Sequence, residues 1–464
     1  MSQSPRSTVR SSLVVALGGF LLGFDSAVVN GVMGPVKEAF GLNSDEVGFT
    51  ASCLILGAMV GNALAGPLAN RFGRRAVLIV TALLFTVSAA WSGLATSFWT
   101  LVSARLIGGV GVGAALLIAP IYIAEIAPPA NRGRLVSFNQ LNIVIGISAA
   151  FFSNYFINGA FSDAVAWRWM LGVEAIPAFL YFALLFSVPC SPRWLLSVGR
   201  RGDAEQAISK LGGDATDIDG FVGGGDEGSS GSRGSLGELF SPRMRRILVL
   251  ALALGFFQQI TGINAIFYYS TTIFGMTGAA RDVALGHAIL VGIVNVVFTL
   301  IAMRLIDRLG RKPLLMIGTA VMAIALFANG AAFSSATYTL NKVATEALSA
   351  TLATETVAGL DELAGQTFDS QPEFLDALRE RITPFGEEQL TAFETNAEGL
   401  AKSALEINGL LVLIAIMAYI AAFAISLGPV MWAMFSEIFP QRLRGLAISV
   451  AGFFNSAVSF GVQQ

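Results

Sequence analysis

The strongest constraint on this chain is a series of apolar segments, each about 20 residues long. A segment of this length crosses the hydrocarbon core of a bilayer as a helix, because only a helix satisfies its own backbone groups there. We therefore predict eleven membrane-spanning helices, over residues 12–32, 47–69, 76–95, 98–123, 134–157, 168–188, 247–275, 284–305, 313–333, 407–435 and 446–464. The first span contains Asp25 and lacks a small-residue cleavage site, so we interpret it as a retained helix and not as a signal peptide.

Composition supports this class and excludes others. Hydrophobic residues make up 54% of the 464 residues and charged residues only 13%, about half the charged share of an ordinary soluble protein. The net charge of −2 argues against a nucleic-acid-binding surface. Two cysteines (Cys53 and Cys190) and one histidine (His287) make neither a disulfide framework nor a metal-ligand cluster. We expect no cofactor and no enzymatic activity, since no nucleophile–base pair or phosphate loop is recognisable.

The basic residues predict the orientation of the spans. With the N-terminus inside, the cytoplasmic segments hold 21 of the 29 lysines and arginines, eight of them in 189–246. Positively charged loops stay on the cytoplasmic side of a membrane. We therefore predict a multi-pass protein of the cytoplasmic (plasma or inner) membrane with a cytoplasmic N-terminus.

Two motifs recur in the same order and indicate two related halves. Asn-Arg-Phe-Gly-Arg-Arg at 70–75 returns as Asp-Arg-Leu-Gly-Arg-Lys at 307–312, 237 residues later. Glu125 and Glu437, 312 residues apart, are each followed seven residues later by an Arg-Gly pair. Internal repeats are typical of secondary transporters, whose substrate site lies at the repeat interface.

The two offsets differ by 75 residues, which indicates an insertion in the second half. The polar segment 334–405, with 12 acidic and four basic residues, fits it. We expect it to be extracytoplasmic and partly helical, and either a solvated spacer or a site for a partner or ligand. A short helical pattern runs from Asp203 to Leu211, before a Gly/Ser-rich stretch around 222–237. The predicted domains are a six-helix bundle over 1–188, a cytoplasmic linker with short helices over 189–246, and a second bundle over 247–464.

Charged residues within the spans are candidates for function, because burying a charge in a membrane is unfavourable. Asp25 and Arg105 each lie seven residues from the outer end of their spans, at a depth of about 10 Å. If their helices are neighbours, the two side chains can meet, either as a proton-coupling pair or as a static pair that fixes helix packing. Glu174 in the sixth span is a weaker candidate.

Carboxamides and aromatic side chains recur near the middle of several spans. A carboxamide both donates and accepts hydrogen bonds, as the hydroxyl groups of a neutral polyol do, although any single one also suits an interhelical bond. Gly262 and Gly428-Pro429 are expected to break their helices beside these residues, at a cavity or as passive kinks. The residues are Gln140, Gln258, Gln259, Asn264, Asn295 and Asn455, with Trp432, Tyr268 and Tyr269 as aromatic platforms.

The cytoplasmic arginines and glutamates have two interpretations. They are either topological anchors or salt bridges between the two halves that close the inner face and break when it opens. The residues concerned are Arg71, Arg74, Arg75, Glu125, Arg132, Arg308, Arg311, Glu437 and Arg444.

The ordered set of motifs resembles the sugar porters of the major facilitator superfamily, and most of all the bacterial sugar–proton symporters. The matching stretches are GFDSAVVNG (23–31), NRFGRR (70–75), RLIGGVGVG (105–113), YIAEIAPPANRGRLVSFNQ (122–140), SPRWL (191–195), QQITGINAIFYYS (258–270), DRLGRKP (307–313) and GPVMWAMFSEIFPQRLRG (428–445). The resemblance implies an all-α membrane protein with the major facilitator fold of two six-helix bundles and alternating access. Because only eleven spans are recognised, the sequence is expected to be truncated after the eleventh.

The resemblance also implies a function and the residues that carry it. The expected function is import of a monosaccharide, a hexose or pentose, with a proton, by a functional monomer in the lipid bilayer. Asp25 matches the proton-coupling carboxylate and Arg105 its basic partner. Sugar contacts carry over to Gln140, Gln258, Gln259, Asn264, Tyr268, Asn295, Trp432 and Asn455.

Some features depart from the family pattern, and two other functions stay open. Cys190 stands where relatives often have Glu, Ser456 follows Asn455 where they often have Trp, and 334–405 is extra. The alternatives to symport are a facilitative uniporter, in which Asp25 and Arg105 are structural, and a non-transporting sugar sensor.

Overall fold

The computed structural model describes residues 5–127, 132–213 and 236–463. Within these residues, eleven helical segments are long and apolar enough to cross a membrane: 7–40, 44–72, 74–93, 98–126, 138–160, 164–185, 242–276, 281–306, 311–334, 409–435 and 443–463. The eleven predicted spans are therefore confirmed, with shifted ends. The chain divides into two compact units, one of Met1–Tyr269, Ile289–Thr319 and Ala421–Gln464, the other of Ser270–Ala288 and Ala320–Ile420.

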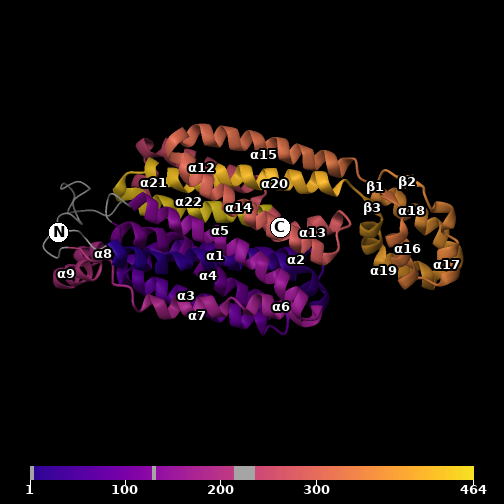
Figure 1. Ribbon diagram of the computed structural model, residues 1–464, viewed down its shortest axis with the longest axis horizontal. Helices are drawn as coiled ribbons and strands as arrows, with labels where there is room; N and C mark the ends of the chain where they lie inside the picture. Colours follow the sequence, from indigo (N-terminus) through magenta and orange to yellow (C-terminus); the bar gives the residue numbers. More distant parts are fainter. Residues whose placement is uncertain (1–4, 128–131, 214–235, 464) are drawn as a thin grey trace. The chain divides into compact units, whose positions relative to one another are not determined.

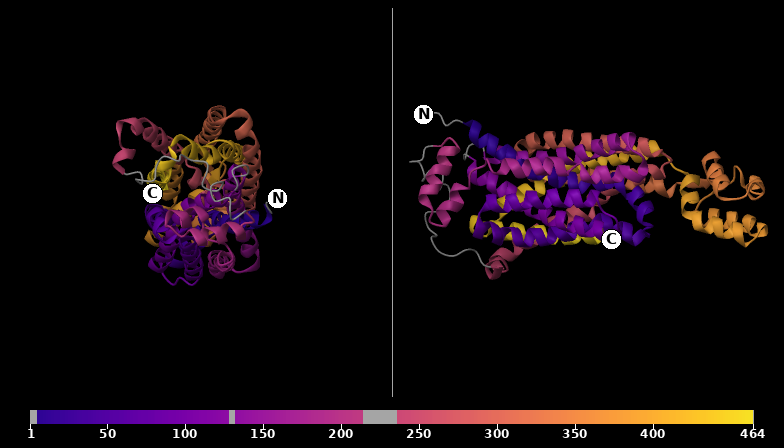
Figure 2. Two further views of the ribbon diagram at one scale, coloured as in Figure 1. Left: turned by 90° about the vertical axis from the view of Figure 1, so that its left-hand side faces the viewer. Right: turned by 90° about the horizontal axis from the view of Figure 1, so that it is seen from below.

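The first unit is a bundle of long helices that run side by side (Figure 1, Figure 2). Complete within it are α1 (Pro5–Phe40), α2 (Ser44–Phe72), α3 (Arg74–Gly93), α4 (Phe98–Ile126), α5 (Arg132–Ala160), α6 (Asp163–Gly172), α7 (Ala175–Leu185), α8 (Pro192–Ser197), α9 (Arg201–Lys210), α11 (Leu236–Leu239), α12 (Pro242–Ile260), α21 (Leu427–Ile438) and α22 (Gln441–Gln463). Parts of α13 (Ile263–Met276), α14 (Arg281–Leu309), α15 (Arg311–Ser334) and α20 (Gly409–Ile425) also belong to it.

Small residues set the close packing of the first helices. α1 packs along α5, and α2 packs along α4. A Cβ atom at Gly57 of α2 would lie 2.9 Å from the Cα atom of Gly109 on α4, so these backbones meet glycine on glycine. The apolar core between the helices includes Phe85, Ile118 and Tyr181, each at most 1% exposed. This packing holds α1, α2 and α4 in a defined register.

Three spans are interrupted. The sixth span breaks at Glu174, between α6 and α7. The seventh breaks at Gly262, whose φ of 82° favours glycine, as predicted. The tenth breaks at Ser426, and α21 then begins at Leu427 with Pro429 in its first turn. The break therefore comes two residues before the predicted Gly428-Pro429, because proline fits the first turn of a helix.

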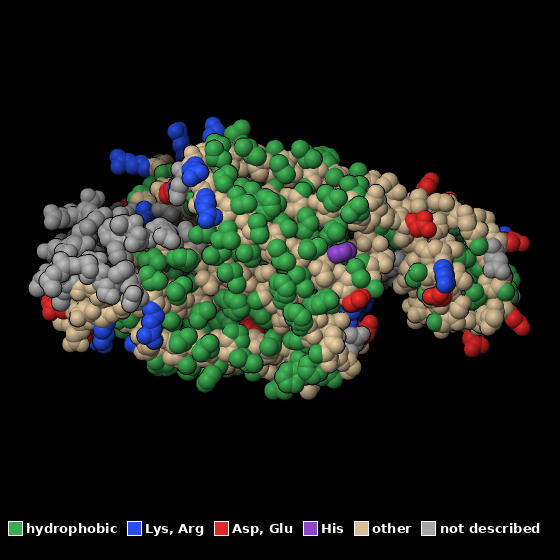
Figure 3. Space-filling model, viewed as in Figure 1, with side chains coloured by type: hydrophobic (Ala, Val, Ile, Leu, Met, Phe, Trp, Pro, Cys, Tyr) green, Lys and Arg blue, Asp and Glu red, His purple; other side chains and the backbone are tan. Residues whose placement is uncertain are grey.

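The flanks of the bundle carry exposed apolar side chains, as a lipid-facing surface requires. Ile176, Phe179 and Phe257 are 72%, 60% and 60% exposed. Figure 3 shows hydrophobic side chains along the helices and basic side chains near the starts of α12 and α15. Patches of this extent are unfavourable in water and suit a bilayer.

The second unit contains the predicted insertion, which is a folded module with its own core. Three short antiparallel strands, β1 (Thr337–Thr339), β2 (Thr367–Phe368) and β3 (Leu405–Glu406), form a sheet in the order β2-β1-β3. The helices around it are α16 (Lys342–Thr351), α17 (Thr354–Ala358), α18 (Gln371–Ile382) and α19 (Glu387–Ala404), with the 3₁₀ turns η2 (Asp361–Leu363) and η3 (Thr383–Phe385) (Figure 1). Leu348, Phe374, Leu378 and Phe393 are at most 1% exposed in its core. The expected helices are confirmed, and the strands were not predicted.

The segment between the predicted halves also contains short helices. The pattern from Asp203 to Leu211 is confirmed as α9, which packs on α8 around Trp194 and Ala207. The Thr8 hydroxyl donates to the Leu211 carbonyl over 3.0 Å, so the start of α1 contacts the end of α9. The Gly/Ser-rich stretch lies almost entirely outside the described residues.

Candidate functional site

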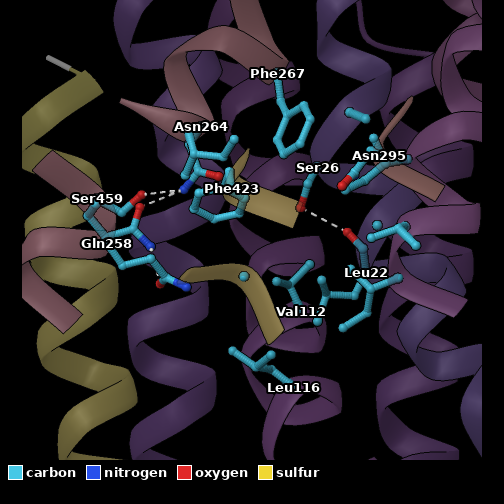
Figure 4. A pocket seen from close by; sticks show the side chains of 18 of the residues that line it. Leu22, Ser26, Val112, Leu116, Gln258, Asn264, Phe267, Asn295, Phe423 and Ser459 are labelled. Carbon is cyan, nitrogen blue, oxygen red and sulfur yellow. Dashed lines mark hydrogen bonds between the residues drawn. The ribbon is translucent and has the colours of Figure 1, made fainter. Parts of the chain in front are cut away.

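A cavity of about 190 Å³ lies in the first unit (Figure 4). Helices from both halves of the chain line it: α1, α2, α4 and α5 from the first half, and α12, α13, α14, α20, α21 and α22 from the second. Pockets for drug-sized ligands occupy roughly 300–1,000 Å³. The cavity therefore favours a smaller ligand, of about the size of a monosaccharide.

The eight predicted sugar contacts all line this cavity: Gln140, Gln258, Gln259, Asn264, Tyr268, Asn295, Trp432 and Asn455. Helices that are far apart in the sequence bring them together, which the spacing of motifs alone does not show. The structure contains no ligand that tests their individual roles, so sugar contact stays a prediction for each.

A network of hydrogen bonds joins the amides on α12, α13 and α22. The Gln259 amide donates to Asn455 Oδ1 over 3.0 Å, and the Asn455 amide donates to Gln258 Oε1 over 2.9 Å. The Asn264 amide donates to both Gln259 Oε1 (2.9 Å) and Ser459 Oγ (2.8 Å), and the second of these bonds is drawn in Figure 4. Because these amides are hydrogen-bonded to one another, the polar wall of the cavity is already ordered before a ligand binds.

The rest of the wall is mostly apolar. Leu22, Val112 and Leu116 of the first half face the cavity (Figure 4). Phe423 and Trp432 add aromatic faces from the second half. An apolar cavity with a few convergent polar groups is the usual form of a small-molecule site. An aromatic face packs well on the C–H face of a sugar ring while amides bond its hydroxyl groups.

Asp25 and Arg105 meet beside this cavity. Arg105 Nη1 forms an ion pair with Asp25 Oδ1, and Arg105 Nη2 donates to the Asp25 backbone carbonyl over 3.1 Å. The two residues are 3% and 2% exposed, so the pair is removed from water. A Cβ atom at Gly108, one turn beyond Arg105, would lie 2.9 Å from Asp25 Oδ2, so glycine leaves room for the carboxylate.

Glu174 is the third buried charge of this region. It is 3% exposed, and it interacts electrostatically with Asp25 and Arg105. The three charged side chains are therefore all withdrawn from water and influence one another electrostatically, and burying ionised groups whose charges are not balanced is unfavourable.

At the basic end of the bundle, the same ion pair occurs twice. Arg74 Nη2 lies 2.9 Å from Glu125 Oε1, and Arg311 Nη2 lies 2.6 Å from Glu437 Oε1. Arg74 starts α3 and Glu125 lies at the end of α4, its neighbour in the bundle. Arg311 starts α15 and Glu437 lies at the end of α21. The repeated motifs thus build repeated contacts.

These pairs are not the bridges between the halves that one of the two interpretations predicts, and that interpretation stays a prediction. Each joins two residues of the same half, and the described residues show no ion pair between an arginine and a glutamate of opposite halves at this end. The reason is that the basic turn and the glutamate of one repeat lie on neighbouring helix ends. Arg71 packs on Phe72, Arg308 is exposed, and Arg444 Nη2 lies 3.4 Å from the Phe439 carbonyl. The Arg132 side chain lies outside the described part.

The linker segment reinforces the first pair. Ser191 donates a hydrogen bond to Glu125 Oε2 over 2.5 Å, and the Trp194 indole donates to the Asn70 carbonyl over 3.1 Å. Arg75 donates to the Leu185 carbonyl over 3.1 Å. The SPRWL motif therefore contacts the basic turn of the first half.

Comparisons with known proteins agree with this architecture. The family described as "Sugar (and other) transporter" matches residues 11–354 and 391–464 and passes over part of the inserted module. The arabinose-proton symporter of Bacillus subtilis is 32% identical, over 100% of this chain and 86% of that relative. The D-xylose-proton symporter of Escherichia coli K12 is also 32% identical, over 95% of this chain and 81% of that relative.

Solved structures show the same likeness. The proton:xylose symporter XylE, a major facilitator superfamily protein solved with 6-bromo-6-deoxy-D-glucose, superposes with a TM-score of 0.70 at 31% identity. That match covers 100% of this chain and 88% of the XylE chain. A partially occluded inward-open XylE from E. coli also gives 0.70, at 30% identity over 99% of this chain and 90% of that one.

The fold, the membrane spans and the cavity define a multi-pass membrane transporter of sugars. The chain belongs to the sugar transporter family of the major facilitator superfamily. Its relatives and structural neighbours are transporters and not enzymes.

Sequence reasoning missed several polar residues of the cavity wall. Ser26, Thr299 and Ser459 line the cavity with the predicted amides. Ser459 was recognisable in principle, because it lies one helical turn from Asn455 and therefore on the same face of α22. Ser26 follows Asp25 directly, and on a helix its side chain points about 100° away. Ser26 therefore lines the cavity, while its neighbour Asp25 forms the ion pair with Arg105.

Proposed function

We propose that this protein imports a monosaccharide, a hexose or a pentose, together with a proton by alternating access between its two halves. The observation that carries the proposal is the buried Asp25–Arg105 pair, whose neighbour Ser26 lines the cavity. A carboxylate paired in this way is a site for loading and releasing a proton. The relatives named as arabinose- and D-xylose-proton symporters support the same proposal.

Protonation of Asp25 changes the forces on two helices at once. It removes the negative charge that holds the Arg105 guanidinium, and so weakens the tie between α1 and α4. α1 and α4 both line the cavity through Leu22, Ser26 and Val112. A change in this tie therefore reaches the sugar site directly, which is how a proton and a sugar can be linked.

The basic end of the bundle supports the orientation that we propose. Arg74, Arg75 and Arg311 lie at this end, on the starts of α3 and α15. Positive charge gathers on the cytoplasmic side of a membrane protein. We propose that this end and the N-terminus face the cytoplasm, that the membrane is the cytoplasmic membrane and that a monomer is sufficient for transport.

Asp25→Asn tests the proposal. Asparagine keeps the size of the side chain and loses its charge and its proton, so uphill sugar accumulation is expected to vanish, while sugar exchange at equal concentrations persists. Asp203→Asn is the matched control, because Asp203 pairs with Arg200 over 2.7 Å on the exposed surface. Accumulation by Asp25→Asn at the wild-type level would contradict the coupling role and make the protein a facilitator. Sugar binding by the wild type with no exchange would make it a sensor.

A further inference from the structure

We infer that Asn62 is a positioning residue of the sugar site, which turns the Ser456 hydroxyl so that it donates a hydrogen bond to a sugar oxygen in the cavity. The inference rests on the proposed import of a monosaccharide, and it adds one donor to that site. Asn62 lies on α2 and Ser456 on α22, and the Asn62 amide donates to Ser456 Oγ over 3.3 Å. Ser456 lines the cavity, whereas Asn62 is not among the lining residues. Asn62 therefore acts on a ligand only through Ser456.

The packing of α2 along α22 brings these two side chains together. A Cβ atom at Gly452, one turn before Ser456 on α22, would lie 3.8 Å from Asn62 Cγ, so the carboxamide lies over this glycine. A Cβ atom at Gly66, one turn beyond Asn62 on α2, would lie 3.6 Å from Ser449 Oγ. Small residues on both helices therefore hold Asn62 against the face of α22 that carries Ser449 and Ser456.

The bond from Asn62 leaves the hydrogen of the Ser456 hydroxyl available. A serine hydroxyl has one donor and two acceptor lone pairs, and the Asn62 amide uses an acceptor position. Within the described residues, no acceptor takes the hydrogen of this hydroxyl. Ser449 on the same helix differs, because its hydroxyl donates to the Gly445 carbonyl, one turn back, over 3.0 Å. Ser456 therefore keeps a free donor at the cavity wall.

Burial fixes the direction in which this hydroxyl points. Asn62 is 2% exposed and Ser456 is 8% exposed, so little water reaches either side chain. A buried amide that loses its partner is left without compensation from water, which favours the orientation in which a lone pair of Ser456 Oγ faces α2. The hydroxyl hydrogen then points away from α2, and the cavity lies beside the same residue. A sugar oxygen there is a suitable acceptor.

The arrangement depends on a position at which this chain departs from the family pattern. Relatives often have Trp where this chain has Ser456. An indole N–H donates but the ring nitrogen does not accept, so a tryptophan there could not receive a hydrogen bond from the Asn62 amide as the serine oxygen does. In this chain the first half therefore influences the sugar through a residue of the second half, and the hydroxyl is oriented only while α2 and α22 pack together at this level.

The test is a double-mutant cycle read by isothermal titration calorimetry. D-glucose, D-xylose, D-galactose and L-arabinose are titrated into the purified wild type, Ser456→Ala, Asn62→Leu and the double variant. Ser456→Ala is expected to weaken sugar binding about three- to tenfold, as loss of one hydrogen bond would. Asn62→Leu is expected to weaken it about two- to fivefold, and to have no further effect when combined with Ser456→Ala.

Ser449→Ala is the matched control. It removes a hydroxyl from the same face of α22, two turns from Ser456, and Ser449 does not line the cavity. Its affinity for sugar is expected to equal that of the wild type. A loss as large as that of Ser456→Ala would show that the packing of α22, and not a contact with sugar, determines the affinity, and would overturn the inference.

Deoxy analogues of the sugar that binds most tightly separate a lost contact from general damage. One monodeoxy analogue is expected to bind wild type and Ser456→Ala equally, because it lacks the oxygen that Ser456 contacts. The other analogues should still show the loss. An unchanged affinity of Ser456→Ala, a loss that is the same for every analogue, or an equal loss from Asn62→Leu with and without Ser456 would each overturn the inference.

Failure of the inference and failure of the proposed function are distinguishable. Binding is measured without transport or proton movement, so the same titrations decide the inference if the protein is a facilitator or a sensor. A wild type that binds none of the four sugars would overturn both the proposed function and the role of Asn62. Sugar binding without the expected dependence on Asn62 and Ser456 would overturn the role of Asn62 alone.

Discussion

The two halves of the chain share the construction of their basic ends but divide the chemistry of the interior. In the first half Arg74 pairs with Glu125 and donates to the Ala69 carbonyl, five residues before it, over 3.1 Å. In the second half Arg311 pairs with Glu437 and donates to the Ile306 carbonyl, also five residues before it, over 3.1 Å. The repeated motif therefore forms the same two contacts in each half, an ion pair with a glutamate and a hydrogen bond to a carbonyl five residues back.

The interior shows no such repetition. Asp25, Arg105 and Glu174, the three buried charges of the site, come from the first half, whereas Gln258, Gln259, Asn264, Asn295 and Asn455 come from the second. Gln140 is the amide that the first half adds. The difference indicates that the two halves keep one ion-pair construction at their basic ends, whereas the interior separates a group of charged side chains from a group of neutral amides. We expect the largest effect from Asp25→Asn. The substitutions that follow test the division between charged and neutral side chains, from larger to smaller expected effects.

Gln259→Ala tests the neutral site. The Gln259 side chain bonds Asn455 and Asn264, so its loss removes a link of the amide network and a candidate sugar contact. We expect sugar binding to weaken by about 1–3 kcal/mol, as for a buried hydrogen bond, while the proton-to-sugar ratio stays unchanged. Isothermal titration calorimetry with the purified protein measures sugar affinity, and the proton flux that accompanies sugar uptake measures the proton-to-sugar ratio. Asn142→Ala is the control, since Asn142 bonds the Phe138 carbonyl within α5 and does not line the cavity. If Gln259→Ala bound sugar as tightly as the wild type does, Gln259 would not be a sugar contact.

Arg74→Ala and Arg311→Ala sharpen the comparison of the basic ends. The side chains of Arg74 and Glu125 are 15% and 12% exposed, and those of Arg311 and Glu437 are 34% and 47% exposed. An exposed ion pair contributes about 0–1 kcal/mol, whereas removing one partner of a more buried pair costs more, because the other charge is left without a partner. We therefore expect Arg74→Ala to lower the thermal midpoint in detergent more than Arg311→Ala does. If Arg311→Ala lowered the thermal midpoint more than Arg74→Ala does, the stabilisation that the two ion pairs provide would not follow their burial.

Removal of the inserted module should have the smallest effect on transport. β1 and β3 pair Thr337 with Glu406 and Tyr338 with Leu405, so the two ends of the module lie side by side. Replacing 340–404 with a four-residue Asn-Gly turn keeps this pairing as a hairpin. We expect the initial rate of sugar uptake to stay within about twofold of wild type, since the module has its own core. Loss of folded, membrane-inserted protein would show that the module supports the transporter and is not a spacer.

The sequence was sufficient for features that depend on local pattern. Eleven spans follow from apolar length, and the break at Gly262 follows from a residue that tolerates a φ of 82°. The eight cavity residues were singled out as amides and aromatic side chains near the middle of their spans, and the resemblance to the family implied sugar contact for each. No spacing rule brings α5, α14 and α22 to one cavity, so their convergence could not be predicted from the sequence.

What sequence did not reveal depends on packing between distant helices. Salt bridges between the halves were one of two interpretations of the arginines and glutamates at the basic end, and sequence did not show that α3 packs beside α4, where Arg74 meets the glutamate of its own repeat. The strands of the inserted module are two or three residues long, too short for an alternating pattern to show.

The central claim is that sugar and proton cross together, and the most direct test is the external pH of de-energised vesicles when sugar is added. We predict that one or more of D-xylose, L-arabinose, D-glucose and D-galactose makes the medium alkaline, and that Asp25→Asn abolishes this signal while sugar exchange continues. Labelled sugar that enters without any change in pH would contradict the account and show that the Asp25–Arg105 pair is structural.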